Sequence, residues 1–347
     1  MSFASHQLTA DRYIVTHEVG AHQTGIRLDA FLKKYYHHRS REQIKGYIDR
    51  GAVSIFRNQG SHVPVGRLKP SLGLLPGDEV QVLSERKPEP PVCFDYKIIF
   101  EDEVLFVIEK PANLPVHPAG RYFFNTLLVH LKTQGHTSPL KTEREFYLVH
   151  RIDKETSGVL VLAKTREVCA HLTRQFAERS TEKRYLAIAR GITPDSFTIE
   201  QSMRRSRHSV IKLKMEVAPE TDGGQTALTS FKKLETAGGF SLLECHPKTG
   251  RQHQIRVHLD FAGFPIVGDK LYGIPESESL GFYERTHLTP EAEAKLLLPR
   301  HALHSAGIHF SHPITSQRLE FRSELPRDLR LFLEAQKKEP GLAQSQV

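Results

Sequence analysis

The chain has 347 residues, of which 39% are hydrophobic, and its formal net charge is +8. This length is typical of two domains, or of one large domain with an appendage, and the positive charge favours a polyanionic partner. The three cysteines form no CxxC pair, which argues against zinc ribbons and disulfide frameworks, and no apolar stretch is long enough to cross a bilayer.

Other classes of protein are also disfavoured. No signal peptide is recognisable, so we expect a reducing, cytoplasmic compartment. The chain lacks a GxGxxG motif, a P-loop and internal repeats, so we expect no nucleotide cofactor. Four histidines lie close together but have no acidic or cysteine ligand spaced with them, so we expect no metal; they are His301, His304, His309 and His312.

The first 85 residues predict a small α+β module. After a strand-like segment, Leu28, Phe31, Leu32 and Tyr35 have the i, i+3, i+4, i+7 spacing of an amphipathic helix. A second helix is predicted from Ser40, which forms a capping-box pattern with the glutamine three residues later. Short β structure follows, with a turn over residues 76–78.

This module resembles the small RNA-binding domain of ribosomal protein S-four and its relatives. The resemblance rests on RLDAFL, SREQIKGYIDRGAVSI and PGDEV, with a core at about residues 25–83. It implies that basic side chains lying off the apolar stripes bind RNA; those side chains are Lys33, Lys34, Arg41 and Lys45. A generic small domain with a solvated basic face is the alternative.

A charged, proline-rich segment, ERKPEPP, is typical of an extended linker. We therefore predict a small domain over residues 1–85, a linker over 86–94, a larger domain over 95–335 and a tail over 336–347. Strand patterns dominate the larger domain, which predicts a mixed sheet with few helices, one of them over residues 125–132. Residues 274–300 fit no pattern and are expected to be a surface insertion.

The segment LVHRIDKETSGVLVLAK, residues 148–164, predicts a strand, a tight loop and a second strand. The loop presents Arg151, Asp153 and Lys154, and a carboxylate between two cations should stay ionised. This is the pattern of a site, but a solvated hairpin with ordinary salt links fits the spacing equally well.

A second segment, PKTGRQHQIRVHL, predicts a helix that opens at about residues 250–251, because Thr249 and Gln252 form another capping-box pattern. Arg256 on this helix has two candidate partners. It pairs with Asp260 on the helix surface, or it reaches Asp153, and sequence spacing does not decide between them.

These two segments, with KRYLAIARG and HALHSAGIHFSHP, resemble the RNA pseudouridine synthases of the RluA/RluD family over about residues 95–335. The resemblance implies a mixed, largely antiparallel sheet with a central catalytic cleft and no cofactor. It implies that Asp153 is the catalytic aspartate, that Tyr185 stacks on the target uracil and that Arg256 pairs with the aspartate. Arg151 and Ile152 match neighbours that displace the target base and fill the gap.

Further contacts with RNA are expected around this centre. Lys183 belongs to KRYLAIARG and Arg251 to PKTGRQHQIRVHL, and His117 lies in a loop similar to that of the tRNA-modifying branch of the family. Arg204, Arg205 and Arg207 are expected to hold phosphates. The target RNA, ribosomal or transfer, stays open, as does the choice between Asp153 as nucleophile and as base; we expect a monomer.

Two other functions compete with this one. A nucleoside or glycoside hydrolase needs a second carboxylate near the first, and Glu155 is close in sequence. A non-catalytic RNA-binding or ribosome-assembly factor would need only the basic module, and the presence of Asp153, Tyr185 and Arg256 together argues against it. A zinc deaminase is disfavoured because its paired cysteines are absent.

Overall fold

The structure is a computed structural model, and it describes residues 4–9, 12–37, 39–57, 63–85, 88–133, 145–285 and 288–338. The chain divides into two compact units. The first comprises Met1–Pro90 and Pro118–Lys141, and the second comprises Pro91–His117 and Thr142–Val347. Residues 339–347 of the predicted tail and parts of the predicted linker and insertion lie outside the described residues.

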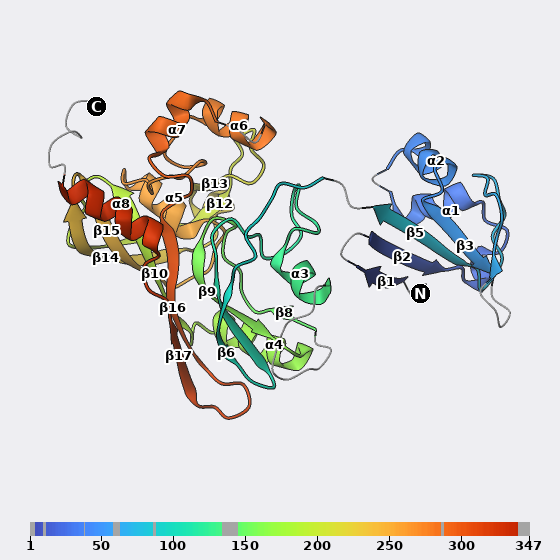
Figure 1. Ribbon diagram of the computed structural model, residues 1–347, viewed down its shortest axis with the longest axis horizontal. Coiled ribbons are helices and arrows are strands. Elements are labelled where there is room, and N and C mark those ends of the chain that lie inside the picture. The colour runs from blue at the N-terminus through green and yellow to red at the C-terminus, as the bar shows by residue number, and fades with distance from the viewer. Residues whose placement is uncertain are drawn as a thin grey trace. The chain divides into compact units, whose positions relative to one another are not determined.

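The first unit is built on an antiparallel sheet with the strand order β1-β2-β5-β3-β4, and two short helices pack on it (Figure 1). Its core joins apolar residues of both helices to those of the central strands. The elements are β1 (Ala4–Leu8), β2 (Arg12–Glu18), α1 (Leu28–Tyr35), α2 (Arg41–Asp49), β3 (Val53–Arg57), β4 (Val63–Pro64), β5 (Glu79–Glu85) and α3 (Leu127–Thr133).

Local sequence signals account for α1 and α2. The apolar side chains of Leu28, Phe31 and Leu32 are buried, as the spacing predicted. The hydroxyl of Ser40 accepts the N–H of Gln43, whose side-chain oxygen accepts the N–H of Ser40, so the predicted capping box is formed.

Residues 118–141 belong to the first unit, whereas the sequence placed them in the larger domain. The rings of Tyr13 and Phe123 lie 5.1 Å apart between centroids. The carboxylate of Glu89 accepts the backbone N–H groups of Phe124 and Asn125 at 3.0 and 2.8 Å. These contacts join residues far apart in the chain, which is why local patterns did not indicate them.

The second unit contains a ten-stranded sheet with the order β11-β14-β15-β10-β16-β9-β7-β6, to which β17 and β8 are added beside β16 and β9. All its pairings are antiparallel except that of β9 with β16, so the predicted mixed, largely antiparallel α+β fold is confirmed. The strands are β6 (Lys97–Glu101), β7 (Leu105–Lys110), β8 (Tyr147–Leu148), β9 (Ser157–Ala163), β10 (Glu182–Arg190), β11 (Ser196–Glu200), β14 (Leu228–Ala237), β15 (Phe240–Pro247), β16 (Leu303–Ser311) and β17 (Arg318–Arg322).

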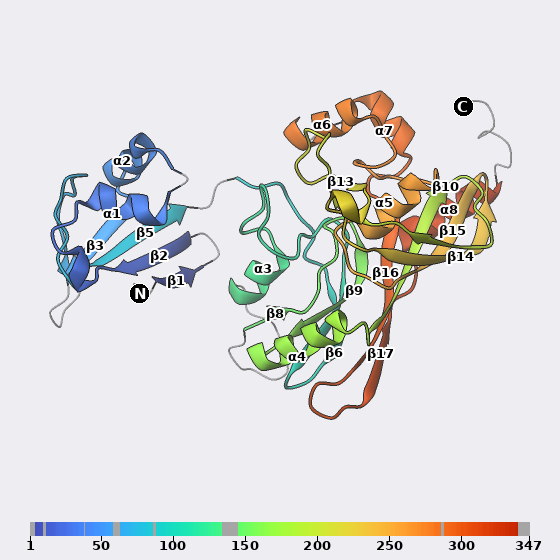
Figure 2. The same cartoon turned by 180° about the vertical axis from the view of Figure 1, so that it is seen from behind.

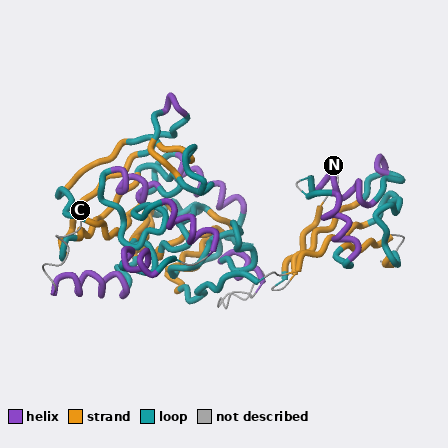
Figure 3. The backbone as a smooth tube through the Cα atoms, turned by 90° about the horizontal axis from the view of Figure 1, so that it is seen from above, coloured by secondary structure: helices purple, strands orange, loops and turns teal. Residues whose placement is uncertain are grey.

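Helices and a small hairpin surround this sheet; they are α4 (Arg166–Ala177), α5 (Gln254–Phe261), α6 (Glu276–Arg285), α7 (Pro290–Leu296), α8 (Arg327–Lys338), β12 (Met203–Arg205) and β13 (Met215–Val217). The expected insertion forms α6 and α7, and α6 lies beside the β12–β13 hairpin (Figure 2). α8 packs on β14 and continues three residues into the predicted tail. Figure 3 shows it as the helix next to the C-terminus.

Helix α5 begins later than the sequence predicted. The hydroxyl of Thr249 accepts the N–H of Leu228 and donates to the side chain of Gln254, so it does not cap a helix at residue 250. The residue before the helix is instead His253, whose φ of 56° lies in the left-handed region. Because Thr249 bonds a neighbouring strand, the helix starts about one turn later than the predicted position.

The parallel pair β9–β16 places the loop that precedes β9 and carries Asp153 against the middle of the sheet. Gly158 opposes Ser305 in this pair, with a φ of 110°. A Cβ atom added to Gly158 would lie 2.2 Å from the carbonyl oxygen of Ser305. Only glycine therefore permits both the backbone conformation and the close approach.

We predict that Gly158→Ala destabilises the second unit. Overpacking of a buried backbone contact costs about 2 kcal/mol or more, which corresponds to a fall of roughly 4–8 °C in the thermal midpoint of a unit this size. The matched control is Gly281→Ala in α6, where an added Cβ meets no atom within 4 Å. Differential scanning calorimetry of both variants tests this, and equal midpoints would contradict it.

Candidate active site

The predicted strand–loop–strand is present, since β8 pairs antiparallel with β9 and residues 149–156 form the loop between them. Lys110, at the end of β7, lies beneath this loop and is fully buried. Its ammonium donates to the carbonyl oxygens of Pro111, Leu114 and Lys154 at 2.7, 3.0 and 3.1 Å. Burial lowers the pKa of Lys110 to about 7, and the charge of Asp153 opposes that shift.

Side chains on the far side of the loop fix it further. Glu155 pairs with Lys270 at 2.7 Å through one oxygen and accepts the backbone N–H of His301 at 3.2 Å through the other. The hydroxyl of Thr156 bonds Nε2 of His301 at 2.8 Å. Because both oxygens of Glu155 are engaged, it is poorly placed to serve as the second carboxylate that a hydrolase requires.

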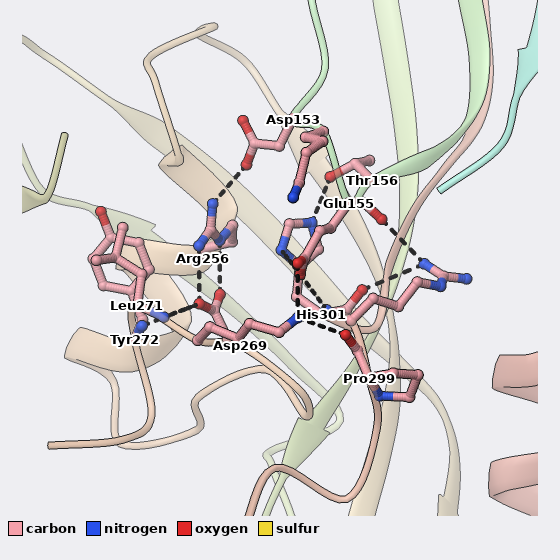
Figure 4. Close-up of polar contacts among 12 residues, drawn as sticks. Asp153, Glu155, Thr156, Arg256, Asp269, Leu271, Tyr272, Pro299 and His301 are labelled. Carbon is pink, nitrogen blue, oxygen red and sulfur yellow. Dashed lines mark hydrogen bonds and ion pairs between the residues drawn. The ribbon is translucent and has the colours of Figure 1, made fainter. Parts of the chain in front are cut away.

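Asp153 pairs with Arg256, whose Nη1 donates to Oδ2 of the carboxylate at 2.8 Å. The other partner of Arg256 is Asp269, not Asp260. Nε and Nη2 of the guanidinium donate to the two oxygens of Asp269 at 2.7 and 2.9 Å. Figure 4 shows the two carboxylates at opposite edges of the guanidinium.

The electrostatics keep Asp153 ionised. Burial by itself raises the pKa of this carboxyl. The positive charges of Arg256 and of protonated His253 outweigh burial, so the pKa lies well below its usual range. Asp269 and Asp153 in turn raise the pKa of Arg256 well above its usual value, against the effect of burial. The side chain of Asp153 keeps 29% of its surface exposed, so the ionised group stays accessible.

A cleft of about 420 Å³ opens beside Asp153. It is lined by side chains from the loop, from α4 and β10 and from the segment before α5. Seven of the residues predicted from the sequence line it; they are Asp153, Tyr185, Arg256, Arg151, Ile152, Lys183 and Arg251. Its volume lies within the range of small-molecule pockets, so it can enclose a single nucleoside.

The predicted residues differ in how they line this cleft. Tyr185 is half-buried on β10, and burial raises the pKa of its hydroxyl to about 12, so it is protonated at neutral pH. Burial lowers the pKa of Lys183 to about 8, and its ammonium donates to the carbonyl of Thr249 at 3.0 Å. Ile152 is 8% exposed, whereas Arg151 is open to solvent.

Other predicted residues lie outside the cleft lining. His117 is half-buried, and burial together with the charge of Arg151 lowers its pKa. Arg204 is held by Glu216 and Asp222, and Arg207 also pairs with Asp222. Arg205 is exposed, and no ion pair is formed by it among the described residues, unlike Arg204 and Arg207.

In the first unit, Lys33 donates to the carbonyls of His37 and Arg39, beyond the end of α1. The other three predicted basic residues, Lys34, Arg41 and Lys45, are exposed.

The sequence did not lead us to assign Asp269, Lys110 or His253 to the site. A lysine two residues after the apolar run LFVI was a signal for a buried ammonium, and an acidic residue in PIVGDK shortly after the α5 segment was a signal for an arginine partner. Neither pattern indicated which residue would be the contact partner of the lysine or of the aspartate.

Among the described residues, no group of three or more histidine, cysteine, aspartate or glutamate side chains is arranged to hold a metal ion. His301 and His304 instead bond the hydroxyls of Thr156 and Ser157. Within the same residues no helix is long and apolar enough to span a membrane.

Comparison with known proteins decides the family. A family model described as RNA pseudouridylate synthase matches residues 104–261. The ribosomal large subunit pseudouridine synthase D of Neisseria meningitidis serogroup B is 35% identical to the chain, over 99% of this chain and 87% of that protein. The chain belongs to the RNA pseudouridine synthase family.

Two further comparisons agree with this family. The ribosomal large subunit pseudouridine synthase D of Zymomonas mobilis is 36% identical over 89% of this chain and 93% of that protein. A solved human structure, RNA Pseudouridylate Synthase Domain Containing 4, is 28% identical, with a TM-score of 0.51, over 70% of this chain and 92% of that chain. The family resemblance of the four sequence segments is thus confirmed, and a non-catalytic factor is disfavoured.

We predict that Asp269→Asn slows pseudouridine formation. An amide places an NH₂ group against a guanidinium N–H, so the two bonds that orient Arg256 cannot both form. Loss of such a supporting partner costs on the order of 10- to 100-fold in activity. The measurement is tritium release from RNA labelled at C5 of uridine, on protein shown by circular dichroism to be folded.

The matched control for this prediction is Asp260→Asn, since Asp260 is exposed and is not a partner of Arg256 in the structure. We expect the control to retain the wild-type rate. Equal losses in the two variants would show that the Arg256–Asp269 pair has no particular role.

Proposed function

We propose that this protein converts uridine to pseudouridine in ribosomal RNA of the large subunit, with Asp153 as its catalytic aspartate. The observation that carries the proposal is an ionised carboxylate, held through one oxygen by Arg256 and exposed in a nucleoside-sized cleft. The names of the two bacterial relatives favour ribosomal RNA of the large subunit over transfer RNA.

The chemistry needs only one carboxylate. The bond between N1 of uracil and C1′ of ribose breaks, the base turns, and a new bond forms from C5 to C1′ while C5 loses a proton and N1 gains one. Asp153 assists through Oδ1, either by attacking C1′ or by removing the proton on C2′. Both routes require an ionised group, and Arg256 supplies the charge that keeps it so in a partly desolvated cleft.

The target base must leave its helical stack to reach Asp153, at a cost of a few kcal/mol. The ring of Tyr185 offers a flat apolar face for the extruded uracil. Ile152 and Arg151 lie on the same loop as Asp153, where an apolar and a charged side chain would fill the vacated position and contact the neighbouring phosphates.

The first unit, in this proposal, holds structured RNA by contacts that do not depend on sequence. Lys34, Arg41 and Lys45 are exposed on α1 and α2, and Arg205 is exposed in the second unit. We further propose a cytoplasmic enzyme that acts as a monomer and, because the sequence contains no P-loop or GxGxxG motif, uses no nucleotide cofactor.

We predict that Asp153→Asn abolishes activity but not RNA binding. The amide has nearly the shape of the carboxylate but is neither a nucleophile nor a base, so tritium release should fall by at least about 10³-fold. Filter binding of the same RNA should stay within about twofold, because phosphate contacts dominate affinity. Retention of full activity by this variant would refute the assignment of Asp153.

We also predict that reversing three charges of the first unit weakens RNA binding. Replacing Lys34, Arg41 and Lys45 with Glu should raise KM by about 10-fold or more, leave kcat unchanged, and lower the slope of log affinity against log salt by up to about 3. The control makes the same charge change at exposed lysines of the second unit, namely Lys97, Lys232 and Lys338. If both triple variants lose affinity equally, only net charge matters and the first unit has no special role.

A further inference from the structure

His253 is the one residue of the cleft lining that combines an unusual backbone conformation with a polar atom close to Asp153. Its φ of 56° and ψ of 17° are left-handed, and its side chain is 8% exposed. Nε2 of the imidazole lies 3.9 Å from Oδ1 of Asp153. That oxygen is the one that Arg256 does not hold, since Nη1 of Arg256 donates to Oδ2.

Tyr272 determines which ring nitrogen of His253 carries the proton. The phenolic oxygen of Tyr272 accepts the backbone N–H of Met215 at 2.8 Å and lies 3.0 Å from Nδ1 of His253. Burial raises the pKa of Tyr272, so the phenol keeps its proton. Among the described residues, Nδ1 is the acceptor within reach of that O–H, and a buried hydroxyl without an acceptor would be costly.

The Tyr272 hydroxyl therefore donates to Nδ1, and a neutral imidazole must then carry its proton on Nε2. The ring is neutral at pH 7, because burial, aided by the charge of Arg256, lowers the pKa of His253 to about 4. Nε2–H is thus a fixed neutral donor in the cleft, beside the reactive oxygen of Asp153. It lies too far from that oxygen for a hydrogen bond, so its proton is available to a bound molecule.

We propose that His253 donates this N–H to the uracil ring during the reaction, first to O2 and, after the base has turned, to O4. The proposal rests on the proposed function, because it assumes that uridine occupies the cleft with C1′ next to Asp153. Oδ1 must approach C1′ or C2′, and O2 of uracil lies two bonds beyond N1, within the reach of a donor placed beside Oδ1.

The symmetry of the uracil ring explains how one donor serves both halves of the reaction. A half-turn about the line through N3 and C6 exchanges N1 with C5 and exchanges O2 with O4. When the N1–C1′ bond breaks, its electron pair stays on the uracil and is shared with O2, so the Nε2–H bond strengthens as charge develops. The proton stays on His253 throughout, and after the half-turn O4 occupies the position that O2 has left.

Two substitutions separate this role from a purely structural one. His253→Asn suits a left-handed residue and retains an amide near the position of Nδ1, but it has no atom at the position of Nε2. His253→Gln fits the backbone less well, yet its amide N–H extends to where Nε2–H lies. A role as backbone support alone would leave the Asn variant near wild type and damage the Gln variant more.

We expect the opposite order. In single-turnover measurements of pseudouridine formation, His253→Asn should reduce the rate by at least about 10-fold with RNA affinity unchanged, since a donor that acts in the transition state affects rate more than binding. His253→Gln should recover part of that loss. A wild-type rate for His253→Asn, or a larger loss for His253→Gln, would overturn the proposal.

A modified substrate tests the contact itself. In RNA that carries 2-thiouridine at the target position, sulfur replaces O2 and accepts hydrogen bonds weakly. This change should slow the wild-type enzyme and have little further effect on His253→Asn. Equal slowing of both proteins would refute the contact with O2, whereas failure of the wild type to convert unmodified RNA would instead refute the proposed function.

Discussion

The cleft depends on the pairing of Arg256 with two carboxylates, those of Asp153 and Asp269. Asp269 takes two donors of the guanidinium and so fixes its plane, which leaves Nη1 directed at Asp153. An arginine paired with Asp153 alone could rotate about its last bonds and would hold the carboxylate less firmly. Asp269 is itself held by the backbone N–H groups of Leu271 and Tyr272. Because breaking a buried pair leaves an uncompensated charge, this chain of contacts is rigid once formed.

The loop that carries Asp153 is fixed independently of its carboxylate. Lys110 bonds the carbonyl of Lys154 from below, and Lys270 bonds Glu155 from the segment that also supplies Asp269. The neighbours Asp269 and Lys270 thus position both Arg256 and the loop, although neither needs to touch a substrate. Such ion pairs add little net stability, since desolvation offsets most of their attraction, but they exclude alternative placements of Asp153.

How much the sequence could predict depended on the range of the interactions involved. Helices α1 and α2 follow from apolar spacing and from the Ser40 capping box, all within a few residues. The predicted start of α5 was wrong because Thr249, which had the pattern of a cap, instead accepts the N–H of Leu228, on a strand 21 residues away in the chain. The pairing of Arg256 with Asp153 spans 103 residues, so spacing left it open and only the family resemblance indicated it. Asp269 was missed for the same reason, because its carboxylate differs from that of Asp260 only in what the fold places beside it.

The charge state of the cleft explains why a neutral donor suits the position of His253. A cation there would pair with Oδ1 of Asp153 and occupy the oxygen that the reaction needs, while Arg256 already supplies the charge that keeps the group ionised. A neutral imidazole beside that oxygen leaves it reactive and still offers one polarised N–H to a substrate. Burial keeps the ring neutral, and the hydroxyl of Tyr272 sets its tautomer. The two oxygens of one carboxylate are thereby given different environments: Oδ2 is fixed by a guanidinium, and Oδ1 is left to act on the ribose.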